Sequence, residues 1–223
     1  MVRIALLHTV QSVADSFGRR LKEFLHDDII IYNFWDEFLA LHPNEIGEFT
    51  KENEERLLLD LKSMAMTDAD LIVVTCSTLS PHLEKARNTI QIPIVAIDDD
   101  MSLNAVKQAS KILVLSTARS AVEPVMDKLS IDARMLGKKV KVTGYVIEEA
   151  FECLKKNNLT RHNEIIRQTV FQTNTKDYDL IVLAQASMEN CMEDIRRITG
   201  KPTISATPFC MKQIKKEVKR MAL

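Results

Sequence analysis

Short apolar runs alternate with amphipathic stretches along the whole chain. The apolar runs fall at about residues 3–8, 29–34, 70–75, 93–97, 111–116, 140–145, 179–184 and 203–206. They are rich in Ile and Val and apolar on both faces, which is typical of strands in a parallel sheet covered by helices. The intervening pattern predicts helices over residues 13–25, 53–66, 81–88, 103–109, 121–136, 147–155, 162–175, 188–199 and 209–222. This alternation predicts βαβ units and a doubly wound α/β fold.

The apolar runs also repeat at a nearly constant offset, which indicates an internal duplication. Residues 70–78 (DLIVVTCST) correspond to residues 179–187 (DLIVLAQAS), 109 positions later. Residues 4–9 correspond to 112–117, and residues 92–97 to 201–206. The offset is far longer than the ~20 to 50 residues of solenoid repeats, so we expect two pseudo-symmetric lobes with short, mainly parallel sheets. The expected N-terminal lobe comprises residues 1–98 and 208–223, the C-terminal lobe comprises residues 99–207, and a cleft separates them.

Composition narrows the class of protein. A chain of 223 residues with net charge −1 offers no global attraction for nucleic acid or an anionic membrane. No apolar run approaches the ~20 residues that span a bilayer, and no secretory signal pattern opens the chain. The four cysteines are widely spaced without a CxxC pair, which suits a reducing cytoplasm and argues against disulfides or a zinc cage. With five glycines, the chain also lacks GxGxxG, P-loop and GxSxG motifs.

Polar residues follow most of the predicted strands, where ligands bind in open α/β sheets. These positions are His8, Thr9, Cys76, Ser77, Thr78, Asp98, Thr117, Arg119, Gln185, Ala186 and Ser187. Hydroxyls and free backbone N–H groups at helix starts suit a small carboxylate, so we expect a carboxylate substrate or ligand.

Cys76 is the candidate catalytic residue. Ser80-Pro81 downstream has the pattern of an N-cap followed by proline at the first helical position. A thiol facing a helix N-terminus has a lowered pKa, which favours a reactive thiolate. The alternative is a buried cysteine that packs as a small apolar residue. Cys153, Cys191 and Cys210 are expected to pack in the core, although Cys191 and Cys210 could approach the cleft.

Several other candidates have two interpretations each. Residues 98–100 (DDD) could bind Mg²⁺, but acidic residues before a helix more often cap it. His8 could carry a proton or could be a hydrogen-bonded structural group. Arg119 could clamp a carboxylate or could begin a surface helix. Residues 41–47 (LHPNEIG) predict a loop, with a mobile flap as one hypothesis.

The chain resembles the aspartate/glutamate/hydantoin racemase superfamily. The resemblance rests on the Thr75-Cys76-Ser77-Thr78 turn, the His8-Thr9 opening, the strand at 92–97 that ends in Asp98, and the pseudo-twofold pairing. It implies two α/β lobes, a cleft for a small carboxylic acid, no metal and no organic cofactor. Partners beyond this ligand are not expected, apart from a possible homo-oligomer.

The resemblance also raises a question of mechanism. In these racemases one cysteine from each lobe flanks the stereocentre, whereas this chain has Gln185 at the second position. An amide has no proton to exchange at neutral pH. Three possibilities follow: a racemase or isomerase using Cys76 with a residue such as Cys191 or His8, a single-thiol decarboxylase or lyase, or a protein that binds a small acid without turnover.

Overall fold

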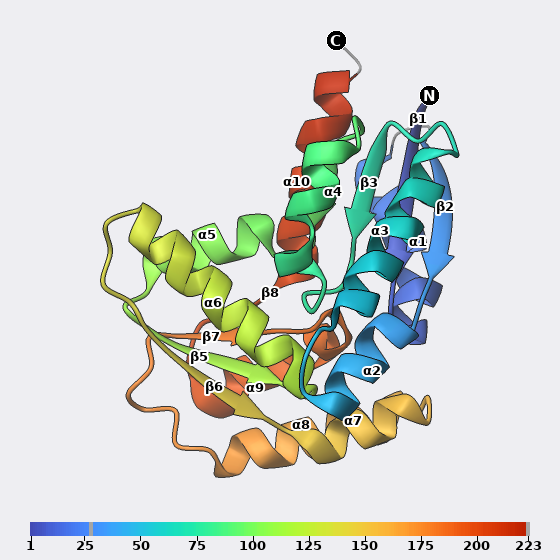
Figure 1. The fold of residues 1–223 in the computed structure, drawn as a ribbon. Coiled ribbons are helices and arrows are strands. Elements are labelled where there is room, and N and C mark those ends of the chain that lie inside the picture. The colour runs from blue at the N-terminus through green and yellow to red at the C-terminus, as the bar shows by residue number, and fades with distance from the viewer. Residues whose placement is uncertain (27–28, 222–223) are drawn as a thin grey trace. The chain divides into compact units, whose positions relative to one another are not determined.

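The computed structural model describes residues 1–26 and 29–221, and these residues form two compact units (Figure 1). The first unit comprises Met1–Asp99 with Pro208–Leu223, and the second comprises Asp100–Thr207. The boundaries expected at residues 98 and 207, as limits of separate domains, stay predictions. So does the cleft.

The first unit contains a four-stranded parallel sheet in the order β2-β1-β3-β4. Its strands are β1 (Val2–His8), β2 (Ile29–Trp35), β3 (Leu71–Val74) and β4 (Ile94–Ala96). Its helices are α1 (Gln11–Leu25), α2 (Phe38–Ile46), α3 (Lys51–Ala65), the 3₁₀ turn η1 (Ser80–His82), α4 (Glu84–Thr89) and most of α10 (Ala206–Met221). Residue 222 of the predicted last helix lies outside the described residues.

The second unit repeats this arrangement with the strand order β6-β5-β7-β8, again all parallel. Its strands are β5 (Lys111–Ser116), β6 (Lys141–Val146), β7 (Leu180–Leu183) and β8 (Thr203–Ser205). Its helices are α5 (Asp99–Gln108), which begins at the boundary, α6 (Arg119–Met135), α7 (Glu148–Lys155), α8 (Leu159–Gln172), η2 (Ala186–Cys191) and α9 (Met192–Thr199). The predicted fold of two doubly wound α/β lobes is therefore confirmed.

Successive side chains of a strand point to opposite faces of the sheet. Corresponding side chains of the two repeats therefore pack in corresponding apolar clusters. Ala5 and Leu7 of β1 pack in one apolar cluster with Leu57 and Leu61 of α3. In the second unit, Leu113 and Leu115 of β5 pack in a cluster with residues of α8, η2 and α9. Both faces of each central strand are buried, which explains their continuous apolar sequence.

One local prediction was wrong. Residues 41–47, expected as a loop, lie mostly in α2, which has Pro43 in its interior and ends at Gly47 with a φ of 87°. Leu39, Ala40 and Pro43 are buried on one side of this helix. The burial of these side chains stabilises the helix despite the backbone hydrogen bond that proline cannot donate.

The described residues contain no helix that is both long and apolar enough to cross a bilayer.

Candidate active site

Polar residues of the first unit gather where β1 and β3 end. These neighbouring parallel strands place His8 and Thr9 beside Thr75 and Cys76, and the backbone N–H of Thr75 donates to the carbonyl of Leu7 at 3.0 Å. Thr9, Thr75, Ser77 and Thr78 are all buried, and Cys76 is half-buried. The structure therefore brings these sequence-predicted positions together within the first unit.

Cys76 lies in the loop between β3 and η1, with its side chain against the apolar cluster of the first unit. Burial raises the pKa of the Cys76 thiol above its ordinary value. The neighbouring Thr9 and Thr78 hydroxyls and the N–H groups of Thr78 and Leu79 act in the opposite direction and lower this pKa, without cancelling the effect of burial. Cys76 is thus half-buried, with hydroxyl and backbone N–H groups near its thiol.

The predicted lowering of the Cys76 pKa by a helix N-terminus was wrong. The element that follows is a three-residue 3₁₀ turn whose N-cap residue is Leu79, which forms no side-chain cap. Ser80 is its first residue, and the Ser80 hydroxyl donates to the Asp98 carboxylate at 2.7 Å. A turn of this length supplies little dipole, so desolvation decides the direction of the shift.

His8 is held by hydrogen bonds on both ring nitrogens. Nδ1 lies 2.8 Å from the Thr75 hydroxyl oxygen, and Nε2 lies 3.1 Å from Asn33 Oδ1. Burial lowers the pKa of His8, so the ring is neutral near pH 7 and has one donor and one acceptor. The Thr75 hydroxyl donates to the Leu7 carbonyl at 2.9 Å, so its oxygen accepts the Nδ1–H of His8. This geometry favours the structural interpretation of His8, as the group that holds the end of β3 next to Cys76.

Gln185 lies at the equivalent position of the second unit, directly after the Leu180–Leu183 strand and Ala184. Its Oε1 atom accepts hydrogen bonds from the Thr117 N–H at 2.6 Å, the Thr117 hydroxyl at 2.8 Å, the Ala118 N–H at 3.1 Å and the Ser116 hydroxyl at 3.1 Å. We call these four donors the Ser116–Ala118 cradle. Ala118 is the N-cap residue of α6 and forms no side-chain cap, and Gln185 supplies the acceptor for its backbone N–H.

The cradle fixes the orientation of the Gln185 amide. Backbone N–H groups only donate, so the atom facing Thr117 and Ala118 must be the oxygen rather than the nitrogen. The Nε2 group therefore points away from the cradle, and it donates to no side chain or carbonyl in residues 1–26 and 29–221. Thr9 and Thr117 are equivalent residues of the repeat. Thr9 lies beside Cys76 in the first unit, and Thr117 lies beside Gln185 in the second.

Of the other predicted site residues in the second unit, some are buried and one is exposed. Ser187 is buried at the start of η2, beside the half-buried Ala186. Arg119 is exposed and forms an ion pair with Glu148 through Nη2 at 2.5 Å. This pair favours the interpretation of Arg119 as a surface helix start.

Asp98 and its two acidic neighbours do not form a metal site in the structure. Asp98 is fully buried beside Ser80, and the Asp99 carboxylate accepts from the Ala96 N–H at 2.9 Å and from Arg87 at 2.7 Å. Asp99 is the first residue of α5, as expected for a helix start. The described residues contain no group of three or more His, Cys, Asp or Glu side chains that could hold a metal ion.

The remaining cysteines have surroundings typical of packing. Cys191 and Cys210 are buried, and Cys153 packs against the core of the second unit. The Cys191 thiol donates to the Asn163 carbonyl at 3.8 Å, and burial raises its pKa to about 11. Cys191 is fully buried, unlike the half-buried Cys76, which favours its packing role.

Two sets of contacts could not be predicted from the sequence. Asn33 contacts His8 from β2, and its position at a strand end carried the only available signal. Asp36, Arg56 and Asp60 form a charged cluster, in which Arg56 Nε donates to Asp36. Burial and the neighbouring Asp36 raise the pKa of Asp60 to about 6. Residues 20 or more positions apart make these contacts, so no local motif could have indicated them.

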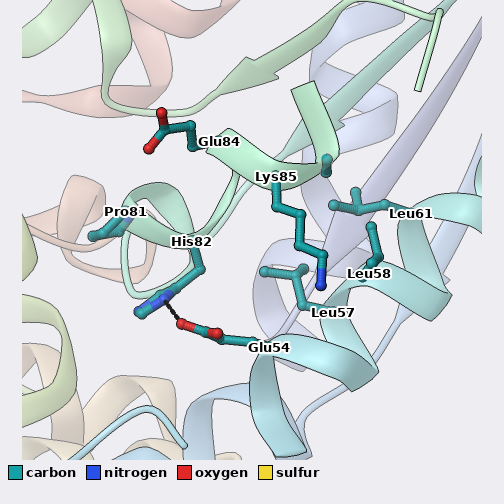
Figure 2. A pocket seen from close by; sticks show the side chains of 9 residues that line it. Glu54, Leu57, Leu58, Leu61, Pro81, His82, Glu84 and Lys85 are labelled. Carbon is teal, nitrogen blue, oxygen red and sulfur yellow. Dashed lines mark hydrogen bonds and ion pairs between the residues drawn. The ribbon is translucent and has the colours of Figure 1, made fainter. Parts of the chain in front are cut away.

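A cavity of about 200 Å³ lies between α3 and the segment from η1 to α4 (Figure 2). Its apolar wall is formed by Leu57, Leu58, Leu61 and Ala86, and at its edge His82 Nδ1–H donates to the Glu54 carboxylate at 3.2 Å. Neither Cys76 nor any other predicted site residue of the first unit lines this cavity. The candidate active site is therefore the strand-end cluster, not this cavity.

A family model described as Asp/Glu/Hydantoin racemase matches residues 43–214, which include both Cys76 and Gln185. The chain belongs to this family. As a member of the Asp/Glu/Hydantoin racemase family it is a racemase-type enzyme, which confirms the resemblance inferred from the Cys76 turn and the internal repeat. No curated protein sequence matches the chain.

Solved structures of racemases share the fold of this family member. Glutamate racemase from Francisella tularensis subsp. tularensis, in complex with D-glutamate, has a TM-score of 0.76 at 12% identity and covers 99% of this chain and 82% of its own. Aspartate racemase from Picrophilus torridus has a TM-score of 0.71 at 13% identity, covering 98% and 95%. Allantoin racemase from Klebsiella pneumoniae has a TM-score of 0.68 at 14% identity, covering 99% and 89%. At these identities the likeness shows the fold alone.

Proposed function

We propose that this racemase-type enzyme acts on a small carboxylic acid, an amino acid or a related compound, and that Cys76 is its proton-transfer group or nucleophile. The observation that supports this role is the surroundings of the sulfur. Cys76 lies at the carboxyl end of β3, half-buried, with polar groups of Thr9, Thr78 and Leu79 beside it. A cysteine that only filled space would not need these polar groups.

The raised pKa of Cys76 is compatible with chemistry at carbon. At neutral pH the resting group is a thiol, which can deliver a proton. Once it is deprotonated, a thiolate with a higher pKa is a stronger base for removing a proton next to a carboxylate. The surrounding hydroxyl and N–H groups would then hold the negative charge on sulfur.

The proposed substrate class rests on the polar strand ends and on the related folds. A glutamate racemase with D-glutamate bound shares the fold, which supports a carboxylate with an acidic carbon. The buried Thr9, Ser77 and Thr78 hydroxyls would bind such a group in the first unit.

An exchange experiment tests this proposal. The protein is incubated in D₂O with a panel of small amino and hydroxy acids, and α-deuterium is measured by mass spectrometry and NMR. We expect wash-in with the native protein and none with Cys76→Ser or Cys76→Ala. Cys153→Ala, which removes a thiol from the core of the second unit, is the matched control and should retain exchange. No exchange across the panel would contradict the proposed proton transfer.

A single-thiol decarboxylase or lyase is the second candidate, and the state of Gln185 favours it. Proton transfer on both faces of a carbon requires two acid/base groups, whereas the Gln185 amide is fixed by four donors and has no proton to exchange. This candidate predicts CO₂ or alkene release from a small diacid or hydroxy acid, dependent on Cys76, without inversion of configuration. Release that persists in Cys76→Ala would exclude it.

A further inference from the structure

The second unit has a strongly cationic cavity at the edge of its sheet where β5 and β6 begin. It has a volume of about 610 Å³ and lies among the start of β5, the end of α6 and the segment that leads into β6. Its charged lining consists of Lys111, Arg134, Lys138, Lys139 and Lys141, without an acidic residue. We call this cavity the basic pocket.

The charges of the basic pocket are not neutralised by ion pairs. Lys111, Arg134, Lys139 and Lys141 form no ion pair with any residue that the structure describes, whereas arginines elsewhere in this unit, such as Arg196, pair with carboxylates. The Lys138 ammonium donates to the Lys107 carbonyl at 2.5 Å. In a chain with net charge −1, this local excess is a distinct feature.

One carboxylate lies close by, and backbone groups already engage it. Asp179 accepts hydrogen bonds from the Ser110 N–H at 3.0 Å and the Lys111 N–H at 2.8 Å. These bonds, together with Lys111 and Lys201, lower the pKa of Asp179, which therefore carries a full negative charge at neutral pH. The Asp179 carboxylate offsets one positive charge and leaves an excess of positive charge in the basic pocket.

The cationic side chains are not needed to cap α6. The last carbonyls of this helix accept backbone N–H groups, from Leu136 to the Asp132 carbonyl at 3.1 Å and from Lys138 to the Ala133 carbonyl at 2.9 Å. Gly137, with a φ of 64°, donates to the Arg134 carbonyl at 3.0 Å. The helix end is thus closed by its own backbone, and the Arg134, Lys139 and Lys141 side chains are not used to cap it.

We infer that the basic pocket binds a small molecule with two or more linked phosphates, such as inorganic polyphosphate or a nucleoside di- or triphosphate. Lysine ammonium groups and the forked Arg134 guanidinium match phosphate oxygens, and the exposed position of these side chains leaves them accessible to a ligand from solvent. A single carboxylate would leave most of these charges uncompensated.

The basic pocket is separate from the Ser116–Ala118 cradle. β5 begins at Lys111 in the pocket and ends at Ser116 in the cradle, and its six residues span about 17 Å at 3.3 Å per residue. A ligand in the pocket is therefore distinct from a substrate at the carboxyl ends of the strands, and this inference does not rest on the proposed function.

Isothermal titration calorimetry of the full chain tests the inference. The probes are orthophosphate, pyrophosphate, tripolyphosphate and ATP at 150 mM salt. We expect one-to-one binding that strengthens from orthophosphate to tripolyphosphate, and a loss of about tenfold or more in Arg134→Gln/Lys139→Gln. Equal affinity for tripolyphosphate and ATP supports a site for the phosphate chain alone, and tighter ATP binding supports a nucleotide site.

A charge-matched variant separates a site from general attraction. Lys155→Gln/Lys156→Gln removes two exposed positive charges at the end of α7 in the same unit, and it should bind the probes like the native protein. Circular dichroism confirms that both double variants are folded. The inference is overturned by absence of binding, by equal weakening in both double variants, or by tighter binding of a 20-nucleotide single-stranded DNA that spans several copies of the protein.

Discussion

Replacing Gln185 by methionine should destabilise the second unit, because methionine has a similar size but no comparable acceptor. Three donors would lose their partner: the N–H groups of Thr117 and Ala118, and the Thr117 hydroxyl. The Ser116 hydroxyl would keep the Ala118 carbonyl at 2.8 Å. Each buried donor left without a partner costs about 1 to 3 kcal/mol. Gln185 is half-buried, so water can reach the site, and the lower value applies. The expected loss is about 3 kcal/mol.

Differential scanning calorimetry measures this loss directly. For a chain of this size about 3 kcal/mol corresponds to a fall in Tm of about 6 to 12 °C. Gln185→Glu is the informative comparison, because a carboxylate accepts from the same donors and interacts favourably with the N-terminus of α6. It should retain or exceed native stability at pH 7. A loss below about 1 kcal/mol in Gln185→Met would show that water replaces the amide oxygen and would refute a capping role.

Three further predictions concern other parts of the chain. The rate of iodoacetamide labelling of Cys76 should rise only above the pH at which a free thiol reacts, because burial raises the pKa of this thiol. Fast labelling at pH 7 would contradict the conclusion that burial outweighs the neighbouring polar groups. Asp60 has its pKa raised from 3.8 to about 6, so its contribution to stability is complete below pH 3.8 and is lost as pH rises through about 6. Asp60→Asn should therefore become more stable than the native protein as pH rises from 5 to 8, by about 1 kcal/mol after allowance for solvent screening, and a stability difference in thermal melts that does not change with pH would contradict this. Gly144→Ala should lower the free energy of unfolding in urea by about 1 to 3 kcal/mol, because the added Cβ would lie 2.6 Å from Met126 Sδ and 2.7 Å from Val122 Cγ2. Gly18→Ala is the control, since the nearest atom to its added Cβ is at 3.4 Å, and it should be neutral or stabilising. Equal losses of stability in the two variants would contradict the steric explanation.

The fold was predictable because its signal is repeated and local. Buried parallel strands need continuous apolar sequence, so the runs at 4–8 and 112–116 identified equivalent central strands without any structure. The same pairing brought Cys76 and Gln185 to equivalent positions. The loop predicted at 41–47 failed because proline and glycine are local signals, whereas the burial of Leu39 and Ala40 depends on the rest of the unit.

The chemistry of the site was less predictable, because it depends on contacts between distant residues. Gln185 caps α6 from 68 positions away, beyond the reach of any capping motif. The pKa of Cys76 follows from burial, which sequence does not give, so a local helix argument gave the wrong direction. His8 similarly needed Asn33 and Thr75 to be placed before its role could be chosen.

The path of the chain through the two units has a consequence for biosynthesis. The second unit is one uninterrupted segment, whereas the first requires both its opening 99 residues and the segment that begins at Pro208. Met211, Ile214 and Val218 of α10 are buried. At about 5 to 20 residues per second, the nascent first unit waits about 5 to 20 s for the ribosome to supply this last helix. During that interval its unfinished core is exposed, so chaperone dependence and aggregation during translation should concentrate in the first half of the chain.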